Sequence, residues 1–341
     1  MKNRVDTSRN KTPWDNIEDV TTLQSFIKNK YNENYKFKHP ELTSSKEYII
    51  INSIEINSCR CCNSLNIIKR GRTKNNIQIY YCKSCKKRFT PTKGTIFENH
   101  KISITEWIEF LLNLFNNSST NLVSKNNKNS INTSIFWLQK VFLVLDGYQD
   151  NISLSGNVYI DETYYKVIKN DILKKQNGKE FKGISYNQYC IGLGYDGKNI
   201  IAISEGLGKT SSEKTKKAFI EHIEKNSTLI HDEEKSHNIL IEELSLKNIA
   251  YNSSELKGLD DKDNPLRKIN HQCDLLKKFL NSHSGFDRKN LQNYLNLYCF
   301  IYNCRKNRLE KVEEFLKLAL NKNVSLKYHL LSHLEHNLFQ I

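Results

Sequence analysis

The sequence lacks any long apolar run. No segment of its 341 residues approaches the roughly 20 consecutive apolar residues that a membrane-spanning helix requires. The first residues, MKNRVDTSRNKTPWDN, contain no apolar core of the kind that a signal peptide carries. We therefore expect a cytoplasmic protein that has no membrane as a partner.

Acidic residues are scarce relative to basic ones. The chain has 37 Asp plus Glu against 52 Lys plus Arg, which gives a formal net charge of +15 and a pI near 9.2. Each phosphate that Lys or Arg neutralises releases condensed counterions, so this balance favours a polyanion as the partner. Ribosomal and membrane-surface proteins share such a charge, so the charge alone does not identify nucleic acid. The length suits two or three domains.

A disulfide framework is not expected for the nine cysteines in a reducing compartment. Cys59, Cys62, Cys82 and Cys85 instead form two Cys-x-x-Cys pairs with 19 residues between them. Each pair can project two thiolates from one tight turn, and two such knuckles complete the tetrahedral shell that zinc prefers. Short strand-like runs (NIIKR, IQIYY, KRFTP) surround them. We predict a small β zinc ribbon over residues 56–100, with a structural rather than a catalytic zinc.

Basic residues are dense within this predicted ribbon. A module of this size is too small to fold without metal, and such a density of positive charge on it argues for contact with a polyanion. We therefore interpret these residues as a DNA-backbone contact surface. A solvated basic face is the alternative. The residues are Lys69, Arg70, Arg72, Lys74, Lys83, Lys86, Lys87 and Arg88.

The next segment, residues 101–152, has helical periodicity. TEWIEFLLNLF and SIFWLQKVFLVL repeat apolar residues at helical spacing, and NNSSTNLVSKNNKNS interrupts them. We predict helices over Glu106 to Phe115 and Ser134 to Leu145, separated by a break, as in a helix-turn-helix-like DNA-binding segment. The large apolar residues are expected in the core and not as base readers. They are Trp107, Phe110, Leu111, Phe136, Trp137 and Phe142.

From Gly156 onward the pattern changes to strands with intervening helices. Three strands (NVYIDETYY, QYCIGLGYD, KNIIAISEG) precede a helix over 211–225, the strand STLIHD, a helix over 237–244 and the strand KNIAYNS. This order is typical of an α/β ribonuclease H-like core. Further helices are predicted over Gln272 to Leu280, Lys289 to Tyr302 and Glu310 to Leu320.

Two aspartates occupy unusual positions in this region. Asp161 falls within an apolar and aromatic strand, where an unpaired carboxylate is costly to bury, and Asp232 directly follows the short apolar strand STLIH. Two carboxylates at strand ends of one sheet can face the same point, where two magnesium ions would activate water and stabilise a leaving oxygen in phosphodiester cleavage. A helix cap or a solvated strand end is the alternative for either residue alone.

The helix that begins at INHQCDLLKKFLNSHSGF adds further polar side chains. The spacing brings several of these side chains to one helical face: Asn270, Cys273, Asp274 and Lys277 or Lys278. Asn270 and Asp274 can offer oxygen ligands, and Lys277 or Lys278 can hold phosphate. Elsewhere, Glu162, Glu233 and Glu234 are interpreted as supporting or solvated acids.

Four motifs between Cys59 and Asn303 together resemble one known group of proteins. CRCC…CKSC, YIDETYY, LIHDEEKSH and INHQCDLLKKFL…GFDRKNLQNYLNLYCFIYN occur in the order found in bacterial insertion-sequence transposases with an N-terminal zinc ribbon and a DDE-type domain. In that group the catalytic motif ends in Asn or Glu followed by Lys. The resemblance implies that Asp161 and Asp232 are the first two ligands of magnesium or manganese, and that Asn270 and Lys277 match the final helix.

The chain departs from this group at one position. Three residues after the Asn, many relatives carry Glu or another side chain that can bind metal, whereas this chain has Cys273. Cys is a poor magnesium ligand, so we assign it no role. Three alternatives follow: Asp274 substitutes through a small shift, Asn270 suffices, or this copy is impaired.

These expectations give a domain order and a function. We predict an N-terminal segment of unknown role (1–55), the ribbon (56–100), the helix-turn-helix-like segment (101–152), the ribonuclease H-like DDE-type domain (153–305) and a C-terminal helical tail (306–341). The resemblance implies a DNA transposase that binds terminal inverted repeats of double-stranded DNA, cleaves phosphodiester bonds and transfers 3′ ends to target DNA as a homo-oligomer. The alternatives are a non-catalytic zinc-ribbon regulator, including a decayed transposase, and a nuclease without strand transfer.

Overall fold

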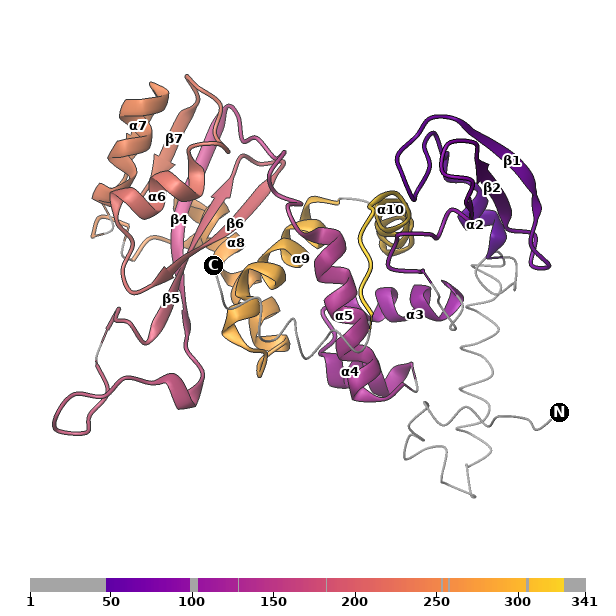
Figure 1. Ribbon diagram of the computed structural model, residues 1–341. Coiled ribbons are helices and arrows are strands. Elements are labelled where there is room, and N and C mark those ends of the chain that lie inside the picture. Colours follow the sequence, from indigo (N-terminus) through magenta and orange to yellow (C-terminus); the bar gives the residue numbers. More distant parts are fainter. Residues whose placement is uncertain are drawn as a thin grey trace. The chain divides into compact units, whose positions relative to one another are not determined.

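The computed structural model describes residues 47–98, 104–127, 129–181, 183–252, 254–256, 258–304 and 307–327 (Figure 1). The chain divides into two compact units, Met1–Val144 with Lys306–Ile341 and Leu145–Arg305. The sequence also favours a helix over Leu23 to Lys30 in the N-terminal segment of unknown role, and these residues lie outside the described ones. Among the described helices, none has both the length and the apolar character needed to cross a membrane.

The first unit contains a small antiparallel sheet with the strand order β1-β2-β3. It forms where the strand-like runs were expected, and Ile67 pairs with Cys82 across β1 and β2. Tyr80 and Phe89 are buried, and their rings stack with centroids 5.6 Å apart. The elements here are α2 (Tyr48–Asn52), β1 (Ile67–Arg72), β2 (Gln78–Cys82) and β3 (Arg88–Phe89).

Four further helices belong to the described residues of the first unit. Trp107 and Trp137 stack at 4.5 Å between ring centroids, and both are buried, as the sequence predicted. Phe110, Leu111 and Phe142 are buried as well, whereas Phe136 is only partly buried and lies 4.8 Å from the Lys140 ammonium. The helices are α3 (Ile104–Leu114), α4 (Thr120–Asn126), α5 (Ile131–Leu145) and α10 (Arg308–Asn321).

The expected break between the two predicted helices is wrong, because α4 forms within it. The Ser119 side chain accepts a hydrogen bond from the Leu122 backbone N–H at 3.3 Å, which caps the helix, and Val123 is fully buried. A local cap and one buried apolar side chain therefore override the low helix propensity of the Asn/Ser-rich sequence.

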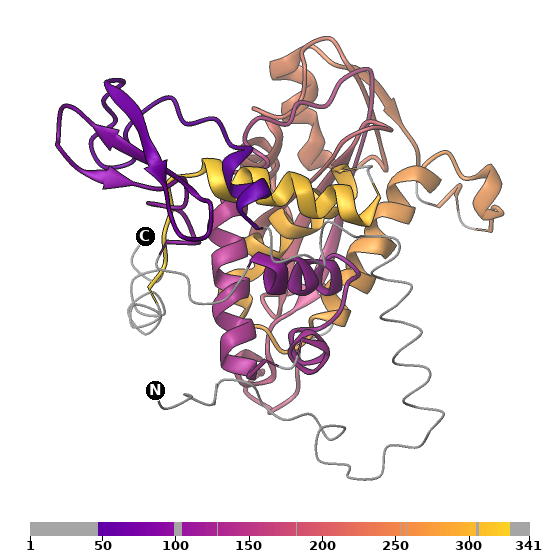
Figure 2. The same cartoon turned by 90° about the vertical axis from the view of Figure 1, so that its right-hand side faces the viewer.

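The C-terminal helix α10 belongs to this first unit. The rings of Phe115 and Phe315 pack edge to face with centroids 5.9 Å apart, and α3 and α10 lie beside each other in both views (Figure 2). The Arg60 guanidinium donates to the carbonyl oxygens of Leu320 and Asn321. The predicted C-terminal tail therefore packs against elements that lie far from it in sequence.

The second unit contains a mixed five-stranded sheet with the order β6-β5-β4-β7-β8. The first three strands along the chain are antiparallel neighbours, and β7 and β8 join parallel to β4. All five strands occur where the sequence predicted them. They are β4 (Asn157–Lys166), β5 (Gln188–Tyr195), β6 (Ile200–Leu207), β7 (Thr228–His231) and β8 (Lys247–Ala250).

Helices pack on the sheet through alternate residues of β4. Val158 and Ile160 belong to a buried cluster with Phe219 of α6 and Leu240 of α7. Tyr165 lies at an odd-numbered position of β4 and therefore on the opposite face. Its hydroxyl donates a hydrogen bond to the Leu280 carbonyl of α8 at 3.1 Å. The helices are α6 (Ser212–Phe219), α7 (Asn238–Leu244), α8 (Arg267–Ser282) and α9 (Leu291–Asn303).

Helix α6 ends at Phe219, whereas the sequence predicted a helix up to Lys225. After Phe219 the backbone pairs with Leu154 instead: the Leu154 N–H donates to the His222 carbonyl at 2.7 Å, and the Glu224 N–H donates to the Leu154 carbonyl at 3.0 Å. Helical periodicity in the sequence could not reveal this long-range pairing.

Candidate functional site

The strand register brings Asp161 and Asp232 together. In the parallel pair of β4 and β7, Asn157 aligns with Thr228 and Tyr159 with Ile230. Continuing this register by two residues sets Asp232, which directly follows β7, beside Asp161. The charge of Asp232 accordingly acts on Asp161. Two residues that lie far apart in sequence thus meet at one point of the sheet.

Asp161 is held in an environment that disfavours its ionised form. Burial, together with the negative charges of Asp232 and Glu162, raises the pKa of Asp161 to about 7, against the lowering effect chiefly of one hydrogen bond. That hydrogen bond comes from the Glu162 backbone N–H at 2.8 Å. A divalent cation between the two carboxylates would relieve their repulsion, and their oxygens are the donors that magnesium prefers.

Helix α8 presents Cys273 to Asp161. The Cys273 Sγ lies 3.7 Å from Asp161 Oδ2, and its residue is only 4% exposed. Burial raises the pKa of the Cys273 thiol well above its ordinary value, so the thiol is neutral and donates to the carboxylate. No role was predicted for Cys273, because sulfur binds magnesium poorly. Its contact with Asp161 depends on how α8 packs.

The other residues predicted on α8 flank Cys273. Asn270 is half-buried one turn before it, and Lys277 is exposed one turn after it. The Lys277 ammonium lies close enough to lower the pKa of the Cys273 thiol, although burial outweighs this effect. Asp274 is exposed. Asn270, Cys273 and Lys277 therefore share one face of α8, and the contact with Asp161 is made by Cys273.

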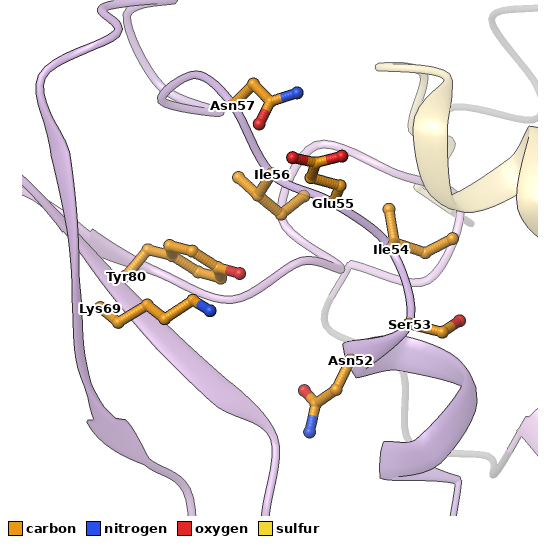
Figure 3. A pocket seen from close by; sticks show the side chains of 8 residues that line it. All are labelled: Asn52, Ser53, Ile54, Glu55, Ile56, Asn57, Lys69 and Tyr80. Carbon is orange, nitrogen blue, oxygen red and sulfur yellow. The ribbon is translucent and has the colours of Figure 1, made fainter.

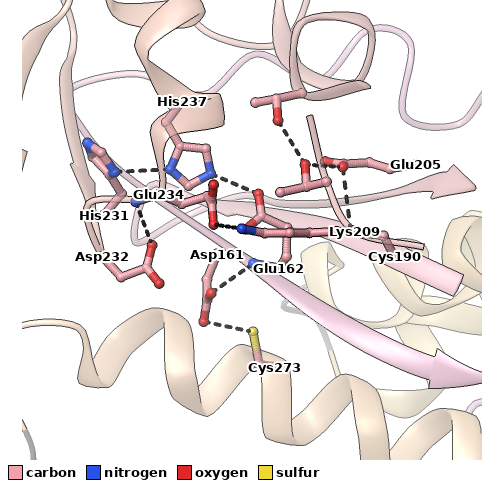
Figure 4. A network of polar contacts seen from close by, with 12 residues as sticks. Asp161, Glu162, Cys190, Glu205, Lys209, His231, Asp232, Glu234, His237 and Cys273 are labelled. Atoms are coloured by element: carbon pink, nitrogen blue, oxygen red, sulfur yellow. Dashed lines mark hydrogen bonds and ion pairs between the residues drawn. The ribbon is translucent and has the colours of Figure 1, made fainter. Parts of the chain in front are cut away.

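A chain of polar side chains with two buried histidines at its centre lies beside the aspartates and was not anticipated from the sequence (Figure 4). Glu162 Oε1 lies 2.8 Å from His237 Nε2, and His237 Nδ1 lies 3.0 Å from His231 Nδ1. His231 Nε2 in turn lies 3.0 Å from Asn248 Oδ1. Both imidazoles are at most 1% exposed. The two histidines that flank the acidic run in LIHDEEKSH were the available signal.

A second buried acid extends this polar cluster. Glu205 Oε2 accepts hydrogen bonds from the Thr210 hydroxyl at 2.6 Å and the Cys190 thiol at 3.5 Å, and burial raises the pKa of Glu205. Gly192 allows this approach, since a Cβ there would lie 2.7 Å from Glu205 Oε1. Figure 4 shows this group on the side of Glu162 away from Cys273.

The four predicted zinc ligands converge in the first unit. The Sγ atoms of Cys59 and Cys85 are 3.7 Å apart, those of Cys62 and Cys82 are 3.6 Å apart, and all four lie within 4.8 Å of one another. Four sulfurs about 2.3 Å from one zinc would be about 3.8 Å apart in a tetrahedron, so the cluster fits this ion. Cys61 lies outside the cluster.

Backbone donors support both knuckles. The Cys61 N–H donates to Cys59 Sγ at 3.3 Å, and the Cys85 N–H donates to Cys82 Sγ at 3.4 Å. The latter hydrogen bond is the main reason that the pKa of Cys82 is lowered to about 6. These donors favour the thiolate, which is the form that binds metal.

One cavity opens beside the ribbon strands (Figure 3). None of the predicted metal-binding or catalytic residues lines it, and its charged side chains are those of Glu55 and Lys69. The lining residues are Asn52, Ser53, Ile54, Glu55, Ile56, Asn57, Lys69 and Tyr80.

Comparisons with known proteins give only distant similarities. No protein family and no curated protein match the sequence. Among solved structures, the catalytic domain of Mos1 mariner transposase is 12% identical over 56% of this chain and 93% of that one, with a TM-score of 0.30. A chain of the simian T-cell lymphotropic virus intasome bound to the PP2A regulatory subunit B56 gamma is 10% identical over 60% and 74%, with a TM-score of 0.30.

A pre-cleavage Mos1 transpososome is also similar, at 11% identity over 64% of this chain and 78% of that one, with a TM-score of 0.23. At these TM-scores the likeness carries no argument about fold or function. The function proposed below therefore depends on the residues of this chain.

Proposed function

We propose that this chain is a DDE-type DNA transposase of a bacterial insertion sequence with a ribonuclease H-like core. The observation that carries the proposal is the meeting of Asp161 and Asp232 at adjacent parallel strands, where burial and then the charge of Asp232 raise the pKa of Asp161. Such a carboxylate pair is suited to holding divalent cations for phosphodiester chemistry.

Each residue of the centre has a proposed role. Asp161 and Asp232 hold magnesium or manganese, which when bound supplies an activated water and stabilises charge on the leaving oxygen. Asn270 offers an amide oxygen as a further ligand, with Asp274 as the alternative third ligand. Lys277 positions a DNA phosphate on the same helical face. The freed 3′-hydroxyl then attacks target DNA, without a covalent protein intermediate.

The ribbon is proposed to bind DNA. The eight basic side chains that the sequence singled out between Lys69 and Arg88 are all exposed, and in the chain they lie between or next to the two cysteine pairs. Exposed Lys and Arg are suited to contacts with DNA phosphates, which position a protein on the duplex. Two transposon ends must be held together during strand transfer, so we expect a homo-oligomer on the terminal inverted repeats.

The test uses purified protein and labelled DNA that carries the inverted repeats flanking its gene. With Mg²⁺ or Mn²⁺ the parent should cleave this DNA, and Asp161→Ala or Asp232→Ala should abolish cleavage while repeat binding stays near the parental level. The exposed Asp171 gives a matched control, because Asp171→Ala removes a carboxylate of the same unit outside the centre.

Two outcomes would favour the alternative functions. A parent that binds repeat DNA but cleaves it with neither metal would be a zinc-ribbon regulator or a decayed transposase. Cleavage without joining of the 3′ end to a target would indicate a nuclease that lacks strand transfer.

A further inference from the structure

We propose that His231 and His237, together with Asp232, form a second metal site that binds a divalent transition-metal ion. One ring nitrogen from each histidine and a carboxylate oxygen of Asp232 lie within 4.8 Å of one another. The proposal goes beyond the transposase function, because that function requires only the oxygen ligands of Asp161 and Asp232. Asp232 belongs to both sites.

The Nε2 atom of each imidazole lies at hydrogen-bonding distance from an oxygen. His237 Nε2 lies 2.8 Å from a carboxylate oxygen of Glu162, and His231 Nε2 lies 3.0 Å from the amide oxygen of Asn248. An ionised carboxylate only accepts hydrogen bonds, so His237 must donate from Nε2, and the amide oxygen requires the same of His231. In neutral histidines, both Nδ1 atoms are then unprotonated.

These two Nδ1 atoms face each other at 3.0 Å in a buried environment (Figure 4). Two lone pairs at this distance repel, so either one shared proton or a cation must lie between or beside them. Two nitrogens about 2.1 Å from one ion are about 3.0 Å apart when the angle at the ion is a right angle. The observed spacing therefore suits two adjacent ligand positions of a six-coordinate ion.

The surroundings match those of histidines that bind metal. Such histidines almost always donate the remaining ring N–H to a carboxylate or carbonyl oxygen, which fixes the tautomer and the orientation of the ring. Glu162 and Asn248 provide these acceptors. The Glu162 side chain is itself only 6% exposed, so His237 is held from both sides.

A ligand set of two imidazoles and one carboxylate favours a divalent transition-metal ion over magnesium. Imidazole suits zinc, iron, cobalt or nickel, whereas magnesium prefers an all-oxygen set, and a face of two histidines and one carboxylate leaves open positions for water. The ion would tie the end of β7 to the start of α7 through His231 and His237, and would orient Asp232 between the two sites.

The experiment uses the full chain with its ribbon first saturated with zinc and with excess Mg²⁺ present to occupy the proposed catalytic site at Asp161, followed by titration with Co²⁺. We expect one equivalent of Co²⁺ to bind under these conditions. In proton NMR spectra it should produce two strongly shifted, solvent-exchangeable ring N–H signals from the Nε2 atoms of His231 and His237. Thiolate-bound cobalt in the ribbon cannot give such signals, because it has no imidazole ligand.

Variants assign the signals and separate the two proposals. His237→Gln should remove both the extra equivalent and the signals, whereas His283→Gln, which changes another buried histidine of the same unit, should retain them. Asp161→Asn should lose DNA cleavage but keep both signals, so failure of one proposal is distinguishable from failure of the other. A folded parent that binds no Co²⁺ beyond the ribbon, or that lacks the shifted signals, would show that the histidines share a proton and would overturn the site.

Discussion

At the residue scale, the burial of Asp161 beside two other carboxylates should make its affinity for metal depend on pH. Its pKa of about 7 means that a proton competes with metal below that pH, while the ionised carboxylate is available above it. The apparent affinity for Mn²⁺ should therefore fall by about tenfold per pH unit below pH 7 and level off above it.

Electron paramagnetic resonance of free Mn²⁺ across this pH range measures the effect. Asp161→Asn removes the titrating carboxyl, so the variant should bind Mn²⁺ weakly with a flat pH profile. A parent with constant affinity down to pH 5 would contradict the assignment of Asp161 as a metal ligand.

The third ligand is a second question at the residue scale. Because Asn270 shares a helical face with Cys273 and is half-buried, while Asp274 is exposed, we expect Asn270→Ala to lose at least tenfold in cleavage, or about 1.4 kcal/mol of transition-state stabilisation. Asp274→Ala should stay closer to the parental rate. Cys273→Ala should be nearly neutral, since a neutral thiol is a poor ligand for magnesium.

Single-turnover cleavage assays of the three variants decide between the alternatives. Equal inactivity of Asp274→Ala and Asp161→Ala would instead make Asp274 the third ligand.

At the scale of the element, the ribbon depends on its metal. Among the described residues its three short strands bury few apolar side chains beyond Tyr80 and Phe89, so zinc must supply much of the stability. We expect about one zinc per chain, and loss of this zinc in Cys82→Ser.

Cys61→Ser is the matched control, because Cys61 sits in the first knuckle but outside the four-sulfur cluster. Elemental analysis measures the zinc. Hydrogen exchange should show loss of amide protection in β1 and β2 of Cys82→Ser, with β4 and β5 of the other unit unchanged. A Cys82→Ser protein that keeps its zinc would refute the site.

On the scale of the whole molecule, the net charge of +15 should make DNA binding strongly dependent on salt. If six to eight of the ribbon's basic residues contact phosphate, affinity for repeat DNA should fall by about 10³-fold or more between roughly 50 and 200 mM salt. Lys86→Ala should weaken binding and reduce the slope of log affinity against log salt by about one.

Lys217→Ala serves as the comparison, because Lys217 is also exposed but lies on α6 of the other unit. Fluorescence anisotropy at several salt concentrations gives the slopes. Affinity that does not change with salt would exclude the ribbon as a phosphate-contacting surface.

Features that depend on residues close together in the chain could be predicted from the sequence. The spacing of Cys59, Cys62, Cys82 and Cys85 indicated the four-sulfur cluster, and short apolar runs indicated all five strands of the larger sheet. Helix α4 was missed although its cap is local, because Asn and Ser favour turns when judged by composition alone.

The sequence by itself determined the strands, most helices, the cysteine knuckles and the two aspartates as candidates, because each depends on periodicity or spacing over a few residues. Only the tertiary structure decided that Cys273 contacts Asp161, and that Glu162, His237, His231 and Asn248 form one chain of polar contacts. These contacts require the parallel register of β4, β7 and β8 and the packing of α8. Register and packing are set by the burial of whole faces, and no short segment of the sequence contains that information.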